Sequence, residues 1–181
     1  MIRSTGRWIA AVTIVAGLVA GIPAPISVRP VVTADGRVLA SFAAPSAFTE
    51  ESRDVLKTGL TLVFTFDVEL HRPSTLWFDP TLARTRVASS VKFDTLTTSY
   101  QVSKDRDGRV FWSDKASEEA KVREWMTAFD QVALEPGNRL EPNVEYYVRV
   151  RLYTTPRPTV MWFWPWGRDD GSGRTDFTYI R

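Results

Sequence analysis

The sequence has no cysteine and only one histidine among its 181 residues. Without cysteine the chain can form neither a disulfide framework nor a thiolate zinc site, and it has no cysteine for a lipid anchor. A chain of this length can still bury enough apolar surface to fold as one domain without such cross-links. The fold must therefore depend on an ordinary hydrophobic core.

The sequence also lacks a large excess of charge of either sign. Lysine and arginine number 23, aspartate and glutamate number 21, and two of the arginines, Arg3 and Arg7, lie in an acid-free N-terminal stretch. The rest of the chain is neutral overall and has no basic block, which argues against a nucleic-acid-binding surface. Arg149 and Arg151 share one face of a predicted strand, but two arginines alone do not make a basic patch.

Residues 1–26 have the organisation of an export segment. Arg3 and Arg7 precede an uncharged, mostly apolar run over residues 8–22. As a helix this run would span about 22 Å, less than the ~30 Å hydrocarbon core of a bilayer, although an uncleaved anchor remains an alternative. We expect a signal peptide or membrane anchor, followed by a single exported domain over residues 27–181. That places the domain in the periplasm or cell envelope, tethered to the inner membrane if the segment is kept. A buried N-terminal core helix is the weaker alternative.

Catalytic motifs are missing as well. The sequence has no Gly-x-Ser-x-Gly elbow, no glycine-rich phosphate loop and no dinucleotide fingerprint. Any enzyme would have to use His71, the one histidine, and no nucleophile motif supports it. We therefore expect a non-catalytic domain without a cofactor.

The sharpest polar constellation is Asp67, Glu69 and His71, at alternate positions of one predicted strand. Such side chains point to one face about 6.6–6.8 Å apart. That spacing is wide for neighbouring metal ligands unless the side chains converge on ligand distances of about 2.0–2.2 Å. We interpret them as a solvated strand face whose acids keep a sheet edge from pairing. The alternative is an envelope enzyme or a metal-binding domain that uses these three residues.

Apolar and polar side chains alternate along much of the predicted domain. The clearest case is residues 60–70, where every second residue is apolar, and Asp-Gly pairs at 35–36 and 107–108 predict hairpin turns. Two helices are expected, at about residues 49–58 and 116–129. Many short strands with frequent turns predict a mainly β fold. We expect an antiparallel sandwich of the immunoglobulin or fibronectin III kind, after an N-terminal hydrophobic helix.

Residues 140–150 resemble the part of fibronectin type III domains that ends in the tyrosine corner. Leu140, Pro142 and Tyr146 match it, together with the alternating valines that follow. The resemblance implies that the Tyr146 ring packs in the core while its hydroxyl bonds back to the backbone of the turn.

A wider resemblance covers most of the predicted domain. Residues 55–79, 93–102 and 146–152, and the predicted helix before Phe129, resemble an uncharacterised bacterial family, domain of unknown function 4390. The resemblance implies an N-terminal signal or anchor, no assigned activity, and, for some members, a gene beside a sensor-kinase system.

Residues 160–166 are the one segment that core packing explains badly. They form an uninterrupted apolar run, and Pro165 argues against a central strand. Tryptophan suits a protein contact or a membrane interface; the alternative is a loop folded over the core. We expect an interaction surface made of Met161, Trp162, Phe163, Trp164 and Trp166. The sequence thus predicts an exported, membrane-associated interaction module that binds an unidentified envelope or membrane protein.

Overall fold

The computed structural model describes residues 24–33, 36–75, 78–138, 140–155 and 170–180. Most of the predicted export segment and the whole predicted tryptophan-rich surface lie outside these ranges. Within them, no helix is both long and apolar enough to cross a membrane.

The described part is dominated by strands. They are β1 (Ala24–Pro25), β2 (Ser27–Val32), β3 (Val38–Ala43), β4 (Leu62–His71), β5 (Thr81–Asp94), β6 (Ser99–Arg106), β7 (Arg109–Ala116), β8 (Ala128–Leu134), β9 (Val144–Thr155) and β10 (Gly171–Tyr179). The helical elements are the 3-10 turn η1 (Pro45–Ala47), α1 (Glu50–Lys57) and α2 (Glu119–Thr127).

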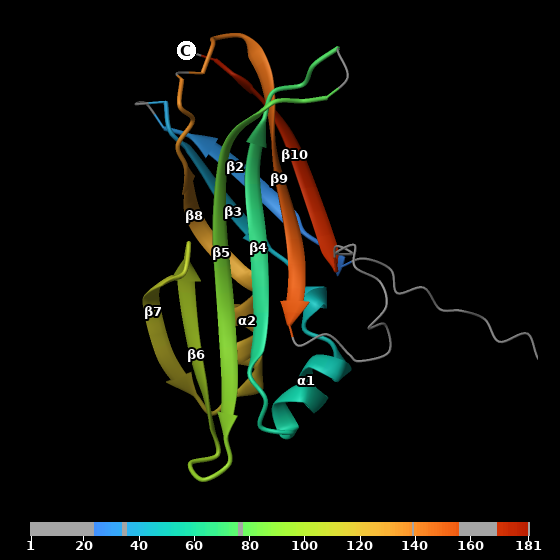
Figure 1. Ribbon diagram of the computed structural model, residues 1–181, viewed down its shortest axis with the longest axis vertical. Coiled ribbons are helices and arrows are strands. Elements are labelled where there is room, and N and C mark those ends of the chain that lie inside the picture. The colour runs from blue at the N-terminus through green and yellow to red at the C-terminus, as the bar shows by residue number, and fades with distance from the viewer. Residues whose placement is uncertain (1–23, 34–35, 76–77, 139, 156–169, 181) are drawn as a thin grey trace, which may run out of the picture.

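Two sheets of unequal size make a sandwich. The large sheet has the order β1-β10-β9-β4-β5-β6-β7, and the small sheet has the order β2-β3-β8. All described pairings are antiparallel except the short pairing of β1 with β10. The small sheet and α2 lie behind the large sheet in Figure 1. The prediction of a mainly β sandwich with two helices is confirmed, with a seven-and-three division of strands.

The core fills the space between the sheets. Phe42 of β3 contacts Phe66 of β4 and Phe129 of β8, with ring centroids 5.0 and 5.4 Å apart. Phe64 lies two residues before Phe66 on the same strand face and meets Phe48 edge-on at 6.5 Å. Aromatic side chains bury large areas, so this cluster fixes the inner face of β4 and, by alternation, its outer face.

The second helix is shorter than predicted. Val122 and Met126 are fully buried, as the apolar spacing requires, but α2 ends at Thr127 and Phe129 already lies on β8. Ala128 has extended backbone angles (φ −123°, ψ 137°). Phe129 is buried, but it belongs to a strand and not to a helix. The spacing of apolar residues alone therefore predicted a helix that was too long.

The outer edge of β8 has no strand neighbour in the described part. Side chains from the large sheet donate hydrogen bonds to two of its backbone carbonyls instead. The Thr85 hydroxyl donates to the Ala133 carbonyl at 3.0 Å, and the Lys104 ammonium donates to the Ala128 carbonyl at 2.8 Å. These bonds satisfy carbonyl groups that would otherwise be exposed to another chain. They also fasten the small sheet to β5 and β6.

Two other strands, β6 and β10, begin beside a turn or a close backbone contact. Strand β6 starts at Ser99, and Leu96 lies in the exposed turn before it. The glycine-containing segment at 171–173 belongs to β10. A Cβ atom on Gly173 would lie 2.2 Å from the Ile26 carbonyl oxygen. Glycine is therefore needed where the chain passes from β1 to β2 against β10.

The tyrosine corner is formed. Tyr146 is almost fully buried, and its hydroxyl accepts a hydrogen bond from the Glu141 backbone N–H at 2.9 Å. Leu140 is buried next to this turn, and Pro142 is exposed on it. The bond ties the start of β9 to the turn that precedes it.

Replacing Tyr146 with phenylalanine should lower the free energy of unfolding by about 1–3 kcal/mol, because the Glu141 N–H loses its partner. Denaturant melts of the two proteins measure the difference. Equal stabilities would show that this bond does not stabilise the corner.

Candidate functional site

The strand β4 places Asp67, Glu69 and His71 in the middle of the large sheet. It pairs with β5 on one side and β9 on the other, so it is not an edge strand. The three side chains point away from the core, yet each residue is only 3–4% exposed. The prediction that they form a solvated face guarding a sheet edge is wrong, because the neighbouring strands carry long side chains that cover them.

Those covering side chains are arginines. Arg84 and Arg86 on β5 lie opposite Glu69 and Asp67, respectively. On β9, Arg149 and Arg151 occupy the equivalent positions. We call these four arginines and the two carboxylates the arginine ladder: Asp67, Glu69, Arg84, Arg86, Arg149 and Arg151.

Asp67 binds the two arginines of β5. Its Oδ2 accepts from Arg84 Nη2 at 2.5 Å, and its Oδ1 accepts from Arg86 Nε at 2.8 Å. Arg84 reaches Asp67 diagonally from its position opposite Glu69. One buried carboxylate thus holds two guanidinium groups, an arrangement that suits the planar fork of arginine.

Glu69 binds the two arginines of β9. Arg149 donates to its Oε2 and Arg151 to its Oε1, each at 2.8 Å. Arg84 lies further away, with its Nε 3.6 Å from Glu69 Oε1. Each buried carboxylate is therefore paired on its own side of β4, and Arg84 links the two halves.

The arginines keep both acids ionised. Burial raises the pKa of Asp67, but hydrogen bonds from Arg86 and Arg84 outweigh it and leave the pKa below its usual value. For Glu69, burial likewise raises the pKa, but hydrogen bonds from Arg149 and His71 and the positive charges of Arg151 and Arg149 together lower it below its usual value. Two permanent negative charges therefore lie beneath the arginines.

The arginine ladder carries more positive than negative charge. Four arginines surround two carboxylates, and the arginine side chains remain 50%, 57%, 38% and 26% exposed in sequence order. No described element lies over this face, which is turned toward the reader in Figure 1. The arrangement can bind anionic groups, because it holds cationic donors at the surface in fixed positions.

His71 lies at the end of this face. Its Nε2 is 3.1 Å from Glu69 Oε2, its Nδ1 is 3.4 Å from Thr81 Oγ1, and its ring stacks on Tyr147. A nucleophile–base–acid chain has this connectivity, but here the acid is already bound to Arg149 and Arg151. Among the described residues, no group of three or more histidine, aspartate or glutamate side chains is placed to hold a metal ion.

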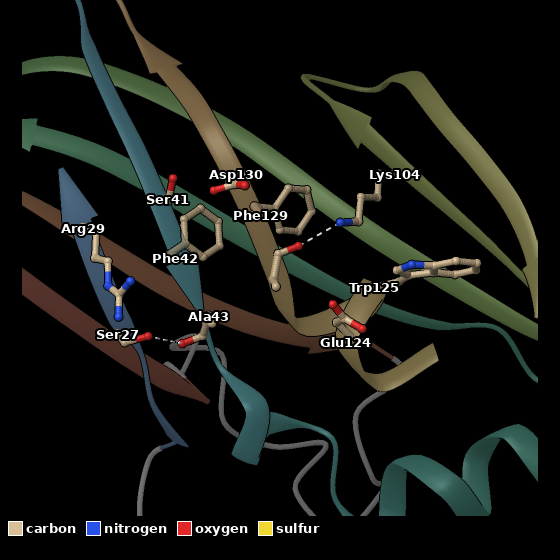
Figure 2. A pocket seen from close by; sticks show the side chains of 11 residues that line it. Ser27, Arg29, Ser41, Phe42, Ala43, Lys104, Glu124, Trp125, Phe129 and Asp130 are labelled. Carbon is tan, nitrogen blue, oxygen red and sulfur yellow. Dashed lines mark hydrogen bonds between the residues drawn. The ribbon is translucent and has the colours of Figure 1, made fainter. Parts of the chain in front are cut away.

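A second candidate is a groove of about 450 Å³ beside the small sheet. Lys104 reaches from β6 toward β8, where its ammonium donates to the Ala128 carbonyl (dashed line in Figure 2). The ammonium nitrogen lies 4.6 Å from the centre of the Phe129 ring. Burial lowers the pKa of Lys104, and Asp130 and Glu124 oppose that shift. Its lining residues include one lysine, one arginine and two acids, so the groove has no net charge. The hydrogen bond from Lys104 to the Ala128 carbonyl, at the edge of β8, accounts for the position of this lysine without a ligand.

Sequence reasoning missed two of the four arginines of the ladder. It noted Arg149 and Arg151 and dismissed them as too few, and it passed over Arg84 and Arg86. The available signal was a shared spacing, since each arginine pair has the same alternate-residue spacing as Asp67 and Glu69. The predicted surface of Met161, Trp162, Phe163, Trp164 and Trp166 lies outside the described residues and stays a prediction.

Acid should destabilise the domain through Asp67 and Glu69. Their folded-state pKa values are lowered, so their stabilisation is complete above the unfolded-state values of about 3.9 and 4.3 and is lost as the pH falls through the folded-state values. Urea melts between about pH 6 and about pH 3 measure this loss. Asp67→Asn should reduce the pH dependence, whereas the exposed Asp130→Asn should keep it. A wild-type stability that is constant over this range would contradict the ion-pair account.

Comparison with known proteins gives a family but no characterised relative. Neither the curated proteins nor the solved structures include a match to this chain. A family model described as Domain of unknown function (DUF4390) matches residues 26–159, which contain the whole arginine ladder. Because this match covers most of the chain, the protein belongs to the DUF4390 family.

Proposed function

We propose that this chain is an exported, membrane-associated domain of the bacterial cell envelope that binds another protein and does not catalyse a reaction. The observation that carries the proposal is the arginine ladder, a sheet face over which no described element lies and whose partly exposed arginines outnumber the buried acids. The family resemblance adds a link to a sensor-kinase system as one setting for such a partner.

Binding fits the ladder better than catalysis does. Glu69 is held by two arginines, so it is a poor partner for a histidine base. Arginine and tyrosine are instead enriched among the residues that dominate protein interfaces. Tyr147 stacks on His71, and Arg174 lies over its ring at 3.6 Å, which extends the arginine-rich face to β10.

The tryptophan-rich segment is the second part of the proposed contact surface. Met161, Trp162, Phe163, Trp164 and Trp166 belong to the chain that connects Thr155 of β9 to Gly171 of β10. The two strands that it joins belong to the large sheet, and one of them, β9, carries Arg149 and Arg151. Aromatic anchors and arginines are the usual pair of dominant contacts in protein interfaces.

Export rests on the N-terminal arginines and the apolar run that follows them. A reporter fused after residue 45 should be translocated out of the cytoplasm. Protease protection and reporter activity measure the outcome. Retention of the fusion in the cytoplasm would contradict the proposed location.

Protein binding is tested by cross-linking the full chain in membranes. Wild type should give a discrete cross-linked product with a second protein, and the double variant Arg86→Gln/Arg149→Gln should lose most of it. In this variant Asp67 keeps Arg84 and Glu69 keeps Arg151, so neither buried acid is left unpaired. A matched control removes the same charge elsewhere, with Arg29→Gln/Arg109→Gln. Equal yields from all three proteins would contradict the ladder as the contact surface.

A further inference from the structure

We infer that the arginine ladder binds an extended acidic segment of the partner, with carboxylates at alternate positions. This inference rests on the proposed function and adds the chemistry and conformation of the ligand. It starts from the spacing of the arginines, their fixed positions and the charges that border them.

The arginines form a regular array. Arg84 and Arg86 are alternate residues of β5, and Arg149 and Arg151 are alternate residues of β9. Alternate residues of a strand are about 6.6–6.8 Å apart on one face. Acidic side chains at every second position of an extended segment have the same repeat, so consecutive carboxylates can meet consecutive arginines.

The arginines are also held in place before a ligand arrives. Each one already donates to a buried carboxylate, which restricts its rotamers. The Nη1 groups of Arg84, Arg86 and Arg149 make no hydrogen bond to any residue in the described part of the chain. Ordering a free arginine on binding is costly, so this restriction favours binding.

Acidic residues limit where the ligand can be acidic. Asp105 and Asp107 line a hollow of about 630 Å³ that Arg84 and Arg86 also line. A carboxylate placed beyond the β5 arginines would approach these two aspartates and be repelled. The acidic stretch of the ligand is therefore short and lies over β5, β4 and β9.

A polypeptide fits this face better than a membrane surface does. Binding to lipid combines basic residues with apolar side chains that enter the bilayer. The large exposed apolar side chains of the described part lie outside the ladder: Val31, Leu60, Phe78, Leu96, Val110, Phe111 and Ile180. A face of arginines and tyrosines with no such side chain suits carboxylates on a protein.

The test measures binding of the purified full chain to a synthetic peptide with glutamate at every second position and threonine between. A peptide of the same composition with its glutamates in one block is the ligand control. The protein variants are Arg86→Gln/Arg149→Gln, which leaves each buried acid one arginine, and the matched Arg29→Gln/Arg109→Gln. Circular dichroism and thermal melts confirm that each variant is folded.

The alternating peptide should bind more tightly than the block peptide, and its binding should weaken as salt rises toward ~0.15 M. The ladder variant should weaken binding at least about tenfold, while the matched control should change it less than about twofold. Equal binding of both peptides, or equal weakening by both variants, would overturn the inference. A second result would also overturn it: neither peptide binds, while wild type binds phosphatidylglycerol vesicles and the ladder variant does not. The ligand of the ladder would then be lipid. The proposed function fails separately, if the peptide binds as expected but no protein is cross-linked in membranes.

Discussion

Two ionised carboxylates are buried in the central strand of the large sheet, and much of the outer surface is arranged around them. Moving a carboxylate out of water costs several kcal/mol unless it is paired. Asp67 and Glu69 are paired by arginines from both neighbouring strands, β5 and β9. The ion pairs therefore join three neighbouring strands on one face of the sheet, while the phenylalanine cluster fills the core on the other.

More arginine is present than this pairing requires. One arginine would neutralise each acid, yet each has two within hydrogen-bonding distance, and all four arginine side chains remain partly exposed. A buried pair contributes little net stability compared with apolar residues of similar size. The excess charge is thus poorly explained by folding alone, and the proposed recognition of an anionic partner rests on it.

The local features of this fold follow from the sequence, whereas the arginine ladder does not. Alternating apolar residues located β4, the Asp107-Gly108 pair adopts the positive φ angles of a hairpin turn, and Tyr146 forms its corner bond. These features depend on residues close together in the chain. The ladder joins residues of three strands. Predicting it therefore requires the order of the strands in the sheet, which no local sequence pattern contains. The predicted helix was longer than α2 because Phe129 has the apolar spacing of the helix in the sequence but lies on the strand that follows it.

The central claim is that the arginine ladder exists for binding and that the fold can do without its charges. The most direct measurement replaces its six residues together with neutral threonine and valine, then compares unfolding and partner cross-linking with wild type. The account predicts a folded protein whose free energy of unfolding is not reduced, as for other buried ion pairs exchanged for apolar groups, and which no longer cross-links to its partner. A folded variant that cross-links as well as wild type would contradict the account.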